Sequence, residues 1–171
     1  MKKSILMIAV SALLVFCTTS CKDDEKTGYD YLTEPKNGWK LTVAVSNPAY
    51  EKADGTMVSD LLTGFLESCE HDDIMYFKTT DAQIVDPGKD KQTTNDNFDC
   101  VERSEKSLGN WQLSSDEKSF TSFYLPYFPG DNLGKEGVAK IVTLNENTLT
   151  VNAGINDGDN DVTFTLTYTK Q

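Results

Sequence analysis

The chain has little histidine, little cysteine and few positive charges for its length. One His and four Cys among 171 residues leave too few ligands for a His-based metal cluster and too few bases for a His-based catalytic triad. Lys and Arg number 16 against 27 Asp and Glu, so the formal net charge is -11. Such an acidic chain is poorly suited to nucleic acid, because phosphate binding depends on Lys and Arg.

Motifs that carry catalysis are also lacking in the sequence. It contains no Gly-x-Ser-x-Gly, no glycine-rich loop that could cradle phosphate, and no His/Cys cluster. We therefore expect a protein that is not an enzyme, with no catalytic residues, no cofactor and no metal site.

The sequence has no hydrophobic run long enough to span a membrane, and its longest hydrophobic run lies near the N-terminus. Residues 5–16 are apolar or small, too short for a membrane span of about 20 residues. They follow two lysines and precede small polar residues and Cys21, which predicts a signal peptide over residues 1–20. Small residues before Cys21 resemble a bacterial lipoprotein signal, in which the Cys is acylated and becomes the mature N-terminus. Cys17 as the acylated residue, or an ordinary cleaved signal, are the alternatives.

The segment after Cys21 is charged and lacks periodicity. Residues 22–26 read KDDEK, which is similar to the surface-export signal of Bacteroidetes lipoproteins. We expect residues 21–37 to form a lipidated Cys with a flexible acidic tether. The membrane would then be one partner, reached through the N-terminal lipid. The expected location is the outer membrane, exposed at the cell surface, with the periplasmic face as the alternative.

Residues 38–171 carry mostly period-two patterns, which predict strands. In residues 39–45, Trp39, Leu41, Val43 and Val45 alternate with polar or small residues, so we expect these four side chains on one buried face. In residues 162–169 apolar residues alternate with threonines, as in a half-exposed sheet. The remaining predicted strands cover residues 74–77, 82–85, 97–101, 111–113, 120–125, 138–144 and 149–151.

The connections between these strands are short. Residues 145–147 and 156–161 predict tight turns, residues 86–97 predict a polar loop, and residues 59–69 predict one helix with Ser59 as its N-cap. The expected fold is all-β: an antiparallel up-and-down barrel of about eight strands with one short helix, because closing the sheet removes exposed edges.

Cys69 and Cys100 are the two cysteines of the expected domain. In an exported protein an even pair predicts a disulfide. Two free thiols, or a redox pair, are the alternatives, although the C-x-x-C spacing of redox proteins is absent.

These features together resemble the lipocalin-like lipoprotein domains of Bacteroidetes. The matching segments are GWKL at residues 38–41, CEHDDIMYF at 69–77, Cys100, GNWQL at 109–113 and IVTLNENTLTV at 141–151. The resemblance covers most of residues 38–171 and implies an eight-stranded calycin-type barrel with a disulfide. Gly38 and Trp39 are adjacent here, where lipocalins carry Gly-x-Trp, and Lys170 is the candidate for the basic residue that covers the Trp.

Trp39, Tyr127 and Phe128 are the candidate ligand-binding residues, since aromatics at a barrel mouth make good ligand or glycan contacts. His71, between acidic neighbours, is better explained by a structural turn than by a metal site. Residues 157–161 resemble the start of a calcium loop but lack its Gly and final Glu, so we expect a hairpin turn, with weak calcium binding as the alternative.

The function that we expect is that of a lipid-anchored envelope protein. It would hold a small apolar or amphipathic ligand in the barrel. The alternative is a surface protein whose barrel is filled by its own side chains and whose loops bind glycan or a partner protein.

Overall fold

The computed structural model describes residues 25–52, 54–64, 66, 69, 71–94, 97–122, 137–156 and 161–171. Helices α1 and α2 cover Gly28–Thr33 and Leu61–Gly64. The strands are β1 Trp39–Glu51, β2 Met57–Asp60, β3 Ile74–Phe77, β4 Ala82–Asp86, β5 Lys89–Thr94, β6 Asn97–Glu102, β7 Lys106–Leu113, β8 Ser119–Ser122, β9 Gly137–Leu144, β10 Thr148–Asn156 and β11 Asp161–Lys170.

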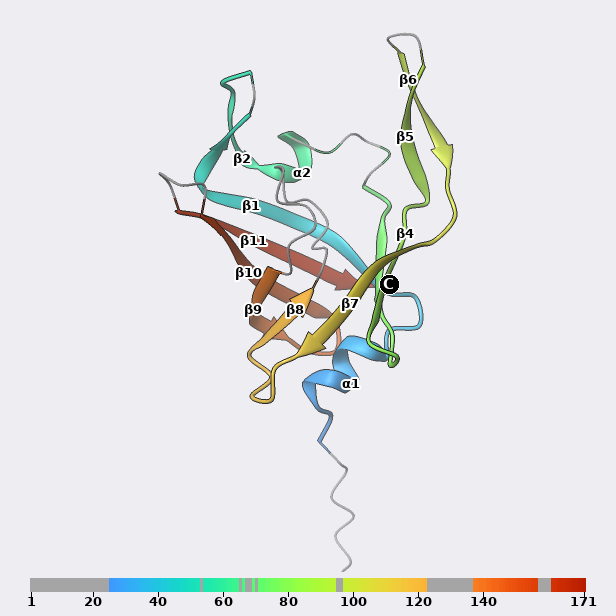
Figure 1. Cartoon of the computed structure of the whole chain (residues 1–171), viewed down its shortest axis with the longest axis vertical. Helices are drawn as coiled ribbons and strands as arrows, with labels where there is room; N and C mark the ends of the chain where they lie inside the picture. Colours follow the sequence, from blue (N-terminus) through green and yellow to red (C-terminus); the bar gives the residue numbers. More distant parts are fainter. Residues whose placement is uncertain are drawn as a thin grey trace, which may run out of the picture.

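Eight of these strands close into an antiparallel barrel (Figure 1). Their order is β11-β10-β9-β8-β7-β4-β3-β1, and β1 pairs with β11 to close the ring. This closing pair is long, from Trp39↔Lys170 to Asn47↔Thr163, while β2 pairs with the distal part of β1. The expected all-β, eight-stranded up-and-down barrel is thus confirmed.

Strand β11 shows how the sequence dictates the barrel wall. Its alternate residues Val162, Phe164, Leu166 and Tyr168 are buried. Threonines occupy the positions between them, and three of these, Thr165, Thr167 and Thr169, are half-buried. Period-two alternation places the two sets on opposite faces, so one set forms the core and the other forms the outer wall.

The predicted inward face of β1 is correct for its first half and wrong for its second. The β1–β11 register shifts between Leu41 and Val43, and such a bulge moves every later side chain to the opposite face. Val43 and Val45 are therefore 44% and 37% exposed, whereas Ala44 is 1% exposed. Ala44 therefore points into the interior, in place of the two valines that were expected there.

Strands β4 and β7 continue beyond the barrel as the β5–β6 ribbon (Figure 1). The β4–β7 and β5–β6 pairs keep the same register across the gap between them. Val85 pairs with Lys106, and Lys89, four residues later, pairs with Glu102, four residues earlier. The Arg103 backbone N–H donates to the Gly88 carbonyl at 2.9 Å across the break. The predicted polar loop at residues 86–97 is therefore wrong, because β5 occupies half of it.

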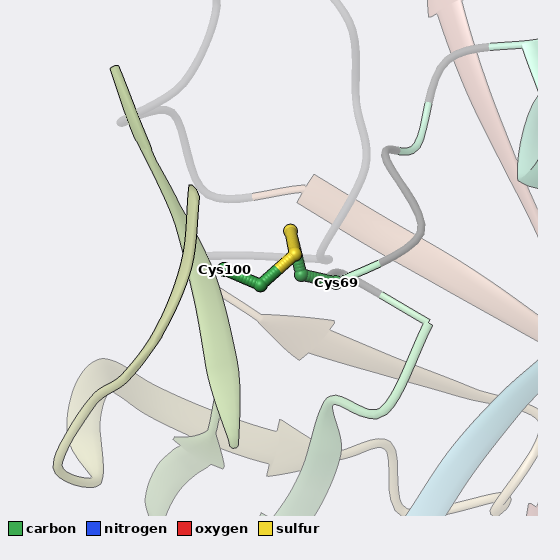
Figure 2. Close-up of a disulfide and its surroundings, with 2 residues drawn as sticks. All are labelled: Cys69 and Cys100. Atoms are coloured by element: carbon green, nitrogen blue, oxygen red, sulfur yellow. A yellow bond between two sulfur atoms is a disulfide. The ribbon is translucent and has the colours of Figure 1, made fainter. Parts of the chain in front are cut away.

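The Cys69–Cys100 disulfide predicted from the sequence is present (Figure 2). It joins the segment after α2 to β6, with a Cα–Cα distance of 5.5 Å, which is within the usual range for disulfides. The bridge therefore ties the ribbon to the connection between β1 and β3.

Helix α1 lies in the segment that we expected to be a flexible tether, so that expectation is wrong for Gly28–Thr33. Thr27 and Asp30 form a capping box at its start. The backbone and hydroxyl hydrogen bonds from Thr27 hold the pKa of the Asp30 carboxyl below its usual value.

Helix α2 is shorter than predicted, with only four residues. The Asp60 carboxylate accepts from the backbone N–H groups of Leu62 and Thr63, so Asp60 performs the capping role predicted for Ser59. Ser59 itself belongs to β2.

The barrel interior as candidate binding site

Helix α1 covers one end of the barrel (Figure 1). Leu32 is 1% exposed and belongs to the hydrophobic core, and its carbonyl accepts the indole N–H of Trp39 at 3.1 Å. On the same helix, Tyr29 stacks on Trp111 with ring centroids 5.5 Å apart. The end of the barrel at which β1 begins is thereby closed by side chains of α1.

Aromatic rings fill the interior next to α1. Phe77 packs edge-on against Trp111 at 5.1 Å and against Phe120 at 5.3 Å, and all three are buried. Trp39 is also among the largest fully buried side chains. Geometry of this kind adds about 0.5–1.5 kcal/mol per aromatic pair beyond area burial. We call these four buried side chains, Trp39, Phe77, Trp111 and Phe120, the aromatic plug.

Interior side chains become smaller with distance from α1 on three strands of the barrel. The inward series are Trp39, Leu41, Ala44 and Ser46 on β1, Leu149, Val151 and Ala153 on β10, and Leu144, Ile141 and Ala139 on β9. Two large inward residues depart from this trend: Phe164 on β11, flanked in register by Ser46 and Ala153, and Phe120 on β8, opposite Ala139. The inward side chains of these three strands are therefore larger next to α1 than farther along the barrel.

Two polar side chains are buried together inside the wall. Gln83 on β4 and Ser122 on β8 are 0% and 1% exposed, and the Ser122 hydroxyl donates to the Gln83 amide oxygen. The Gln83 amide nitrogen donates to the Met75 sulfur at 2.9 Å. A thioether sulfur is a weak acceptor, so this hydrogen bond of the Gln83 amide is weaker than one to a carbonyl oxygen would be.

Tyr168 on β11 is a further buried residue with a polar group. It is 1% exposed, and its hydroxyl has no hydrogen-bond partner within the described part of the chain. Burial raises the pKa of Tyr168 well above its usual value. The hydroxyl is therefore protonated at physiological pH and available as a donor.

The candidate ligand residues are placed only in part. Trp39 lies in the plug, with its indole N–H already bound by Leu32, and its cross-strand partner is Lys170, the residue suggested to cover it. Tyr127 and Phe128 lie outside the described residues, as do Cys21 and most of residues 157–161. Their roles stay predictions.

His71 lies in a turn, as predicted, and contacts a neighbouring element. Its Nε2 is 2.9 Å from the Leu62 carbonyl oxygen of α2. Among the described residues no group of three or more His, Cys, Asp or Glu side chains could hold a metal ion, and none of the described helices is long and apolar enough to cross a membrane.

The outer surface carries a separate open hollow of about 460 Å³ near the C-terminus. It is lined by Glu34, Lys36, Asn37, Lys170 and Gln171. Its charged, exposed lining differs from the apolar interior, so we treat the two as distinct features.

Comparison with known proteins gives likeness at the level of structure alone. No family model matches the chain, and no curated protein matches its sequence. A bovine odorant-binding protein in complex with undecanal is similar, with 14% identity, a TM-score of 0.40 and coverage of 82% of this chain and 73% of that chain. A bovine odorant-binding protein complexed with its natural ligand gives 13% identity, a TM-score of 0.39 and coverage of 88% and 77%. The fold assignment rests on the strand pairing described above.

Proposed function

We propose that the protein binds a small, apolar or amphipathic molecule inside the barrel, at the end remote from α1. The decrease in side-chain size along β1, β9 and β10 carries the proposal. Ligand sites are concave and mostly apolar, with a few placed polar groups, and the interior offers Gln83, Ser122 and Tyr168 as such groups. The aromatic plug beside α1 would form the inner end of this site and contact the ligand there.

Filling this space tests the proposal. Ala153→Leu enlarges an inward residue of β10, while Val142→Leu, the control, places the same residue at a 56% exposed position on the outer face of β9. We would titrate the neutral dye N-phenyl-1-naphthylamine into each protein and follow its fluorescence. Saturable binding to the wild type and to Val142→Leu, weakened about tenfold or more in Ala153→Leu, supports an interior site.

Circular dichroism and denaturant unfolding must show that Ala153→Leu is folded, since overpacking costs about 1–3 kcal/mol. Equal dye affinity in all three proteins, or no saturable binding to the wild type, would overturn the interior site.

A second candidate function is favoured by the β5–β6 ribbon, which extends beyond the barrel and is tied down by a disulfide. A ribbon that extends from the barrel and is fixed by a disulfide can bind a glycan or a partner protein through its surface. Replacing residues 90–101 by a two-residue turn, with Cys69→Ser, tests it. Loss of glycan-array or partner binding with unchanged dye binding favours the ribbon, and the reverse result favours the barrel interior.

The cellular location is part of the proposal. Acylation of Cys21 would hold the protein in the outer membrane, with its domain at the cell surface. Cys21→Ser should release the protein from the membrane fraction, whereas Cys17→Ser, the matched control, should not. Protease added to intact cells should remove the domain, and full protection would place it on the periplasmic face instead.

A further inference from the structure

Tyr168, whose buried hydroxyl has no partner among the described residues, lies on β11 at the level of Leu41, the last large inward residue of β1 before Ala44. In register Tyr168 is opposite Leu41 on β1 and Leu149 on β10. The next inward residue of β1 is Ala44, opposite Leu166. A guest that entered from the remote end would therefore reach Tyr168 with its leading end.

The cross-strand neighbours of Tyr168 cannot satisfy its hydroxyl. Leu41 and Leu149 are aliphatic, and Tyr168 is 1% exposed. Native proteins pair nearly all buried polar atoms with protein or ordered water, so an exception calls for an explanation. Leaving a buried hydroxyl unpaired costs free energy that a bound acceptor recovers.

The charge of the interior restricts what that acceptor can be. The buried polar or charged residues in the described part of the chain are Ser46, Gln83 and Ser122, none of which carries a charge. Among the described buried side chains, a carboxylate taken into this interior would find no cation to pair with, and an unpaired buried charge is strongly disfavoured. The acceptor that fits is a neutral oxygen.

We propose that the Tyr168 hydroxyl donates a hydrogen bond to the ligand, and that the ligand is a neutral carbonyl compound with an apolar body, such as a ketone, aldehyde or ester. The carbonyl end lies deepest, toward the aromatic plug, and the apolar body extends toward the remote end. This specificity rests on the interior site proposed above, which supplies the space for the apolar body.

Three probes with the same number of carbon atoms test the inference by displacement of N-phenyl-1-naphthylamine: 2-nonanone, nonane and nonanoate. They would be compared on the wild type, on Tyr168→Phe, and on Tyr29→Phe. Tyr29→Phe is the matched control, because the Tyr29 hydroxyl donates to the Thr79 carbonyl outside the interior. The wild type should prefer 2-nonanone to nonane, and nonanoate should compete worst at neutral pH.

Tyr168→Phe should lose about threefold to tenfold in affinity for 2-nonanone, the factor for one ordinary hydrogen bond. Its affinity for nonane and its stability without ligand should not fall. Tyr29→Phe should bind all three probes like the wild type. An unchanged ketone-to-alkane ratio in Tyr168→Phe, or tightest binding of nonanoate, would overturn the inference while leaving the interior site intact. No displacement by any probe from the wild type would overturn both.

Discussion

Shortening Leu32 to alanine tests the idea that α1 is a structural cover of the barrel. Leu32 is 1% exposed within the core, and burying a leucine fully is worth about 1.5–3 kcal/mol before any cavity cost. Buried Leu→Ala changes cost about 2–5 kcal/mol. Because α1 has only six residues and can move to reduce the cavity, we expect a loss of about 2–3 kcal/mol in the free energy of unfolding.

Guanidinium unfolding followed by tryptophan fluorescence and circular dichroism measures this loss. Trp39 and Trp111 both contact α1, so their emission reports whether α1 is packed against the barrel. The midpoint should fall with an unchanged slope, while the exposed control Val43→Ala should change stability by less than about 0.5 kcal/mol. A loss below about 0.5 kcal/mol in Leu32→Ala would refute the view that α1 stabilises the barrel.

Three further predictions concern the covalent tie, the start of β1 and acid pH. Replacing Cys69 and Cys100 by alanine should lower the free energy of unfolding by about 3–4 kcal/mol for a sequence separation of 31; equal stability of the double variant and wild type would contradict this. Gly38→Ala should cost more than about 1 kcal/mol in denaturant unfolding, because φ is +78° and the new Cβ would meet Ile74; an unchanged midpoint would refute it. Asp30 has a lowered pKa in the folded protein, so its stabilising effect is present above the unfolded value of about 3.9 and is lost as pH falls through the folded value. Denaturant unfolding between pH 5 and 2 should therefore show a stronger loss of stability toward low pH in the wild type than in Asp30→Asn, and identical pH dependence would exclude this role.

Sequence patterns predicted the barrel where local alternation and tertiary burial agree. β11 is the clearest example, because its apolar and threonine residues separate completely between two faces. β1 shows the limit, since the bulge after Leu41 arises from pairing with β11 and leaves no local pattern. β5 was missed because its residues are polar, and a ribbon outside the core needs no apolar face.

Helix α1 and Tyr168 illustrate two other limits of prediction from the sequence. α1 is too short for a hydrophobic period, although Thr27 and Asp30 at capping-box spacing were a signal for its start. Tyr168 resembles any other inward residue of β11 in sequence. Its unpaired hydroxyl is visible only when the neighbours on β1 and β10 are known.

A crystal structure of the wild-type protein with 2-nonanone tests the central claim most directly. The account predicts one ketone molecule inside the barrel, with its oxygen within about 3 Å of the Tyr168 hydroxyl and its chain directed away from α1. An empty interior, or a ketone bound only on the outer surface, would contradict it.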